Sequence, residues 1–213
     1  MFSRGLVPAF LCFLVIVISV VPAHAANVTL FTNRAAFIAA SSNLQNITFE
    51  GIAPPGNVSP PLASLTLLGV TFSDSPGNVF VVDSAFFAPT FAFGSGASLN
   101  GGTGITAVLP AGITALGSDV MTALGNGPFQ IVLSTGDTFL VPTGSNGVRN
   151  FAGFISDIPI SSIRFNRTAG TPLFDNFVFG QAVAAVPEPR TLVLMGTGLA
   201  ALAIRARKKQ LRI

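Results

Sequence analysis

Residues 26–185 consist of short runs in which apolar residues alternate with Ser, Thr and Gly. Alternation with a period of two places successive side chains on opposite faces, as in a half-buried β-strand. Turn residues interrupt the runs at close intervals, which is typical of a β-sandwich or a barrel. We therefore predict an all-β domain, an antiparallel β-sandwich. Its length of about 160 residues is enough for one domain with a core.

Strands are predicted at residues 28–31, 46–50, 69–73, 79–83, 104–109, 112–120, 129–133, 138–141, 151–155, 160–166 and 173–179. The clearest pair is a hairpin of residues 129–133 and 138–141, separated by a turn through Gly136. Pro110 and Gly112 suit a type I turn. One short helix is predicted at residues 33–40, capped from Thr32 or Asn33. The Pro- and Ser-rich residues 53–64 are predicted to form an exposed loop.

The predicted domain lacks several side chains that active sites commonly use. The single Cys (Cys12) and the single His (His24) both precede residue 26, and the chain has no Trp or Tyr. This excludes disulfides, thiolate or imidazole metal sites and any triad with a His base from the domain. We therefore expect a domain that is not an enzyme.

The net charge of the domain has the opposite sign to that of the whole chain. The formal charge of the chain is +3, but its basic residues are concentrated near the two ends. Residues 26–185 contain seven acids and four arginines, which gives 4 − 7 = −3. A mildly acidic domain does not attract phosphates, so we expect no nucleic-acid partner.

Residues 1–25 have the three parts of a secretory signal peptide. Arg4 supplies the positive charge, residues 11–21 are almost wholly apolar, and Ala23 and Ala25 form a small-residue cleavage site. We predict that signal peptidase removes residues 1–25. The alternative is a retained N-terminal anchor, although the apolar run is short for a membrane span.

Residues 186–213 contain a second targeting pattern. Pro187, Glu188 and Pro189 precede 14 uncharged, mostly apolar residues at 191–204, and a basic cluster follows at 205–209. A helix of 14 residues would span about 21 Å, less than the ~30 Å of a bilayer core. Flanking arginines can extend its reach, and the basic cluster favours a cytoplasmic end. We expect a transmembrane helix, either inserted transiently or acting as a simple anchor.

The Pro-Glu-Pro motif, the apolar segment with Gly196 and Gly198, and the basic end resemble the PEP-CTERM sorting signal. This region is also known as the ice-binding protein C-terminal domain. The resemblance covers about residues 186–210. It implies that an exosortase-type membrane protease recognises Pro187, Glu188 and Pro189 and cuts near them. It also implies export across the inner membrane of a Gram-negative bacterium that makes exopolysaccharide, transient membrane insertion, and a final place at the cell surface or in the matrix.

The central segment resembles the β-sandwich region common in PEP-CTERM proteins, through segments such as NITFEGI, FAGFISDIPISSIRF and LFDNFVFG. Its layout is similar to that of carbohydrate-binding jelly rolls. In such jelly rolls an early-strand acid and a last-strand Asp often share a structural calcium ion, and the matching positions are Glu50 and Asp175.

The position of Asp175 in the predicted strand indicates a charged side chain on an apolar face. It shares strand parity with Phe177 and Phe179, so we predict that it points toward the apolar face. A charge at such a place needs a partner. Calcium is one candidate because it binds carboxylate and carbonyl oxygens. The alternatives are that Asp175 ends the strand or caps a turn, or that it pairs with Arg164 or Arg167.

The stretch 80–93 contains Phe86, Phe87, Phe91 and Phe93, which we expect in the core, with an exposed sugar-binding patch as the alternative. The sequence thus predicts a secreted, non-catalytic component of the exopolysaccharide or biofilm matrix, either structural or glycan-binding. One alternative is a polysaccharide hydrolase that uses Glu50 and an Asp as a carboxylate pair at ~5–9 Å. Another is an adhesion or ice-binding protein, but no regular Thr-x-Thr ladder supports it.

Overall fold

The fold is known from a computed structural model, which describes residues 26–74, 77–86, 98–101, 104–123, 127–143, 148–168 and 170–183. The described strands and helix belong to a compact unit that ends at Ala182. No helix among these residues is long and apolar enough to cross a membrane. The predicted signal peptide with Ala23 and Ala25, and the predicted helix at 191–204, lie outside the described residues.

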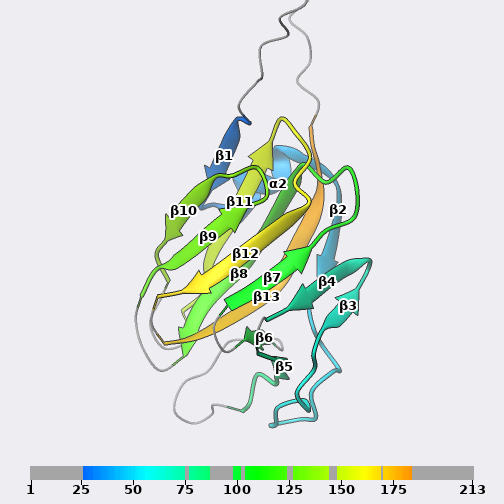
Figure 1. The fold of residues 1–213 in the computed structure, drawn as a ribbon, viewed down its shortest axis with the longest axis vertical. Helices are drawn as coiled ribbons and strands as arrows, with labels where there is room; N and C mark the ends of the chain where they lie inside the picture. Colours follow the sequence, from blue (N-terminus) through cyan, green and yellow to red (C-terminus); the bar gives the residue numbers. More distant parts are fainter. Residues whose placement is uncertain are drawn as a thin grey trace, which may run out of the picture. The chain divides into compact units, whose positions relative to one another are not determined.

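Two antiparallel sheets form the domain, which confirms the predicted all-β class (Figure 1). The larger sheet has the order β1 (Val28–Phe31), β11 (Asn150–Ser156), β8 (Ala115–Ala123), β13 (Thr171–Ala182), β6 (Ser98–Gly101) and β5 (Val79–Val82), while β2 (Ser41–Ile47) also pairs with β13. The smaller sheet has the order β10 (Thr138–Val141), β9 (Phe129–Leu133), β12 (Ser162–Arg167), β7 (Gly104–Val108), β4 (Val70–Ser73) and β3 (Leu65–Leu67).

The predicted hairpin is confirmed, because β9 and β10 pair antiparallel with Phe129 opposite Val141. The turn at Pro110 carries the chain from β7 in the smaller sheet to β8 in the larger one. Gly112 in this turn has a φ of 82°, a conformation that glycine adopts without strain.

The main core lies between the sheets and is rich in phenylalanine. Phe72 from the smaller sheet meets Phe177 from the larger one with ring centroids 5.3 Å apart, and Phe165 meets Phe174 at 4.4 Å. A domain without Trp or Tyr depends on Phe for the large side chains that fill such a space.

The other face of the larger sheet carries the single described helix, α2 (Arg34–Ala39). The Asn33 side chain accepts a hydrogen bond from the backbone N–H of Ala36, which confirms one of the two predicted caps. Phe37 is fully buried and packs with Ala115, Phe151 and other residues in a cluster separate from the main core. The helix therefore covers part of this outer face.

The segment predicted as an exposed loop at residues 53–64 instead lies partly along β5. The backbone N–H groups of Ser59 and Leu62 donate to the carbonyls of Val81 and Val79 at 2.8 and 3.0 Å. The Ser59 hydroxyl accepts a further bond from the Val81 N–H. Prolines cannot donate to a ladder, so the segment pairs at isolated points and still covers an edge strand.

The stretch 80–93 is only partly described. Phe86 is 41% exposed, so the prediction that it lies in the core is wrong. Phe87, Phe91 and Phe93 lie outside the described residues. Phe86 lies in a turn directly after β5, beyond the strand pairing that buries Val81 and Val82.

Candidate functional site

A β-bulge interrupts the last strand, β13. Asp175 lies opposite Asp119 on β8, but Val178 lies opposite Gly117, so β13 has one extra residue between these pairs. Asn176 within the bulge has a φ of 49°, in the left-handed region that Asn adopts more readily than most residues. The bulge therefore shifts the alternation of the strand by one residue.

This shift corrects the predicted orientation of Asp175. Phe174 before the bulge and Phe177 and Phe179 after it all belong to the main core. Asp175 follows Phe174 directly, so it points to the opposite, outer face of the sheet. The prediction that it shares a face with Phe177 and Phe179 is wrong, because strict alternation does not continue through a bulge.

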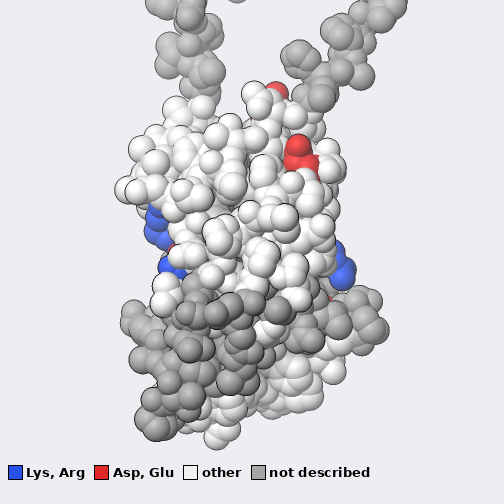
Figure 2. Space-filling view, turned by 90° about the vertical axis from the view of Figure 1, so that its left-hand side faces the viewer, with Lys and Arg blue, Asp and Glu red and all other residues white. Residues whose placement is uncertain are grey.

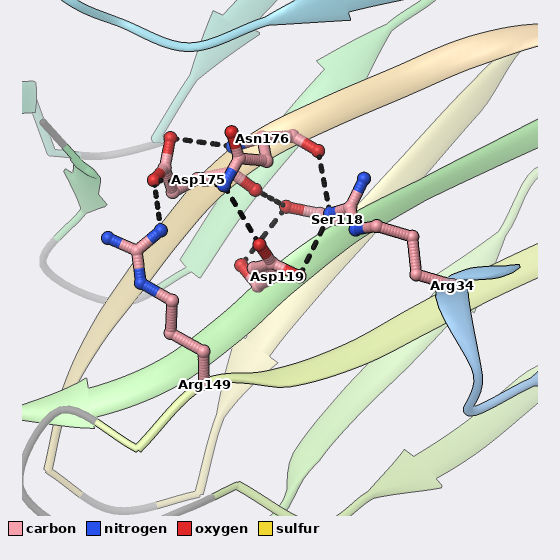
Figure 3. A network of polar contacts seen from close by, with 6 residues as sticks. All are labelled: Arg34, Ser118, Asp119, Arg149, Asp175 and Asn176. Atoms are coloured by element: carbon pink, nitrogen blue, oxygen red, sulfur yellow. Dashed lines mark hydrogen bonds and ion pairs between the residues drawn. The ribbon is translucent and has the colours of Figure 1, made fainter. Parts of the chain in front are cut away.

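Four charged side chains and one amide meet on this outer face (Figure 3). Arg149 Nη1 donates to Asp175 Oδ2, and Arg34 Nη2 donates to Asp119 Oδ1 at 2.8 Å. Asn176 Nδ2 lies between the two carboxylates and donates to Asp119 at 2.9 Å and to Asp175 at 3.3 Å. Two arginines thus balance two aspartates in one connected network.

The same network satisfies backbone groups around the bulge. The Ser118 hydroxyl donates to the Asp175 carbonyl at 2.9 Å, and Arg34 Nη2 donates to the Asn176 carbonyl at 3.2 Å. The backbone N–H of Asn176 donates to Asp175 Oδ1 at 2.6 Å. Buried backbone polar groups need such partners, so the ion pairs and the bulge support each other.

Asp175 is the most deeply buried charge of the network, with 1% of its surface exposed. Burial raises its pKa to about 6, and the Arg149 guanidinium opposes this shift. Because the folded-state pKa exceeds the ordinary value of 3.8, the folded protein binds this proton more tightly than the unfolded chain. The stabilising contribution of Asp175 is therefore complete below about pH 4 and is lost as the pH rises through about 6.

The substitution Asp175→Asn tests this pH dependence. We expect the free energy of unfolding of the unsubstituted protein, relative to the variant, to fall by about 2 to 3 kcal/mol between pH 4 and pH 7.5, from a shift of roughly two pKa units. Urea titrations across this range measure the difference. Asp157→Asn at an exposed position serves as the control. A difference that does not vary with pH would contradict the assignment.

A pocket of about 500 Å³ opens beside the network. Its walls come from the start of α2, from β8, from the end of β10 and from the segment entering β11, through Thr32, Asn33, Arg34, Asp119, Val141, Pro142, Arg149, Asn150 and Phe151. The Arg34 guanidinium lies 4.5 Å from the centre of the Phe151 ring, an arrangement that holds the cation on the wall. The volume falls within the usual range for small-ligand sites.

The predicted calcium residues have different surroundings. Glu50 lines a second pocket of about 210 Å³ with mostly apolar neighbours, including Ile52 and Leu67. Asp175 instead has a guanidinium as its counter-charge. Among the described residues, no group of three or more Asp, Glu, His or Cys side chains could hold a metal ion, although calcium prefers six to eight oxygen ligands. A calcium site shared by Glu50 and Asp175 stays a prediction.

Arg164 and Arg167 are the alternative predicted partners of Asp175, but the structure pairs Asp175 with another arginine. Arg164 lies on β12 in the smaller sheet, where its Nε donates to Asn166 at 2.6 Å and its Nη1 to Thr106 at 3.4 Å. The side chain of Arg167 lies outside the described residues. Arg149 is the partner of Asp175 because β11 follows it directly and borders β8, which borders β13.

The fold and site together define a β-sandwich with a polar pocket between α2, the larger sheet and the end of β10. A family model described as the PEP-CTERM protein-sorting motif matches residues 185–208. The chain therefore carries a PEP-CTERM sorting domain, and Pro187, Glu188 and Pro189 fall within the match, as predicted. This motif marks a secreted, surface-sorted protein that an exosortase processes. No curated protein and no solved structure matches the chain.

Proposed function

We propose that the sandwich is a non-catalytic, glycan-binding component of the exopolysaccharide matrix, to which its sorting motif delivers it. The observation that carries this proposal is the 500 Å³ pocket, whose wall combines guanidinium, carboxylate and amide groups with the Phe151 ring. Such groups supply the donors and acceptors that sugar hydroxyls need. Apart from the β9–β10 hairpin, successive strands from β7 to β13 alternate between the sheets, which supports the likeness to jelly rolls.

The position of the carboxylates supports a binding role rather than hydrolysis. A glycosidase normally needs two carboxyl groups that flank the scissile bond. Asp119 is the one carboxylate among the described residues that line the pocket. Asp175 lies opposite it but is almost fully buried and is held by Arg149. A hydrolase that uses Glu50 would likewise need that residue in the same pocket, and Glu50 lines another one.

Co-sedimentation of the purified protein with the exopolysaccharide of the producing organism tests the proposal. We expect saturable binding without release of reducing sugar, because the described lining of the pocket has groups that bind sugar hydroxyls and a single carboxylate. The assay is run with calcium and with a chelator, so that it also tests the predicted calcium site. Release of reducing sugar would support the hydrolase alternative, and absence of binding would contradict a glycan-binding role.

A further inference from the structure

We propose that the pocket binds a carboxylate of an acidic sugar, so that the polysaccharide it recognises contains uronate or another carboxylated residue. This inference rests on the proposed glycan-binding function and names its ligand class. The sandwich would then be anchored to the matrix through an ionic contact on the outer face of the larger sheet, beside the bulge of β13.

The first argument is the charge that a ligand in the pocket meets. The ionisable residues on the described wall are Arg34, Arg149 and Asp119, which gives 2 − 1 = +1. The side chains of the two arginines are 30% and 19% exposed, and that of Asp119 is 15% exposed. Asp175 balances the network from behind the wall, where its side chain is 1% exposed. The four charges of the network balance, but a carboxylate in the pocket would contact the more exposed guanidinium groups and not the buried Asp175.

The second argument is the hydrogen-bonding capacity of Arg34. Both of its hydrogen bonds to the network come from Nη2. Its Nε and Nη1 have no acceptor among the described residues. The Phe151 ring lies 4.5 Å from the guanidinium carbon, and this contact restricts the side chain before a ligand binds. Charge-assisted bonds from arginine to a carboxylate are among the strongest hydrogen bonds in proteins.

The third argument is the contrast with the rest of the domain. Residues 26–185 have a net charge of −3, and the face shown in Figure 2 carries few charged side chains. An acidic polymer is weakly repelled by such a surface, so a local positive pocket determines where it docks.

The pocket amides are also fixed in place, since the Asn33 side chain accepts from the Ala36 N–H and the Asn150 side chain donates to the Pro142 carbonyl.

Titration calorimetry of the full-length protein in detergent micelles tests the inference. The probes are tetragalacturonate and its fully methyl-esterified form, which has the same sugar rings without the charge. At pH 7.5 and low salt we expect the acid to bind at least tenfold more tightly than the ester. Arg34→Gln is expected to remove this preference, because the affinity for the acid should fall to about the affinity for the ester. Arg164→Gln, in the smaller sheet, is the matched control and should change neither affinity.

Asp119→Asn is a second variant, which distinguishes loss of a ligand contact from loss of binding through misfolding. It removes the negative charge of the wall, so we expect it to strengthen binding of the acid severalfold, a gain that unfolding cannot produce. Equal affinities for acid and ester, or weaker acid binding by Asp119→Asn, would overturn the inference. If neither probe binds while the protein still co-sediments with exopolysaccharide, the acidic-sugar inference fails and glycan binding stands. Failure of co-sedimentation as well would overturn the proposed function itself.

Discussion

Replacing Arg149 with methionine is expected to lower the free energy of unfolding by about 3 to 5 kcal/mol at pH 7.5, because a buried charge loses its partner. Asp175 is 1% exposed, and Arg149 supplies its counter-charge. The pKa of this carboxyl is already raised to about 6 by burial, and loss of the guanidinium would raise it further. At pH 5 the carboxyl is mostly neutral, so the loss should be clearly smaller there.

Urea unfolding of the Arg149→Met variant at pH 7.5 and pH 5 measures both values. The double variant Arg149→Met with Asp175→Asn should recover most of the loss at pH 7.5, because no buried carboxylate remains. Arg164→Met is the matched control, since that arginine bonds to neutral Asn166 and Thr106 and should cost about 1 kcal/mol or less. The same loss at both pH values, together with no recovery in the double variant, would show that the ion pair is not the cause.

Phe177→Ala is expected to lower the free energy of unfolding by about 3 to 5 kcal/mol at any pH in the stable range, the usual cost of a large cavity in a core. Phe177 is 1% exposed and lies after the bulge, where it packs edge-on against Phe72 and near Phe179. Its loss would leave a cavity between the two sheets. Urea denaturation gives the free energy, and thermal unfolding gives the matching fall in Tm.

Phe86→Ala is the control for this substitution, because Phe86 is 41% exposed and its removal opens no comparable cavity. We expect a change of about 1 kcal/mol or less. A similar loss for both phenylalanines would contradict the assignment of Phe177 to the core and of Phe86 to the surface. This comparison uses the same chemical change at two burial levels and therefore isolates the effect of burial.

Local patterns in the sequence were enough to predict much of the sandwich. The hairpin of β9 and β10 follows from two alternating runs and the turn at Gly136, and the short helix follows from its cap at Asn33. These features depend on neighbouring residues alone. The path of residues 56–62 along β5 was not predictable in this way, because its bonds join Ser59 to Val81 across a loop.

The site was harder to predict from the sequence for the same physical reason. A single extra residue at Asn176 reverses the side-chain alternation, and the polar pair Asp175–Asn176 inside an apolar strand is the one signal that could have indicated it. The salt bridge between Arg34 and Asp119 joins residues 85 positions apart. Such contacts arise only when the sheet assembles, so composition and spacing do not contain them.

The position at which β13 ends bears on what removal of the sorting motif does to the domain. The last described strand pair joins Ala182 to Ser41, and the matched sorting motif begins at residue 185. Removal of the motif would therefore take away no strand pair that the structure describes. The sorting motif follows the domain along the chain, so we expect the sandwich to keep its described strand pairs when the motif is removed.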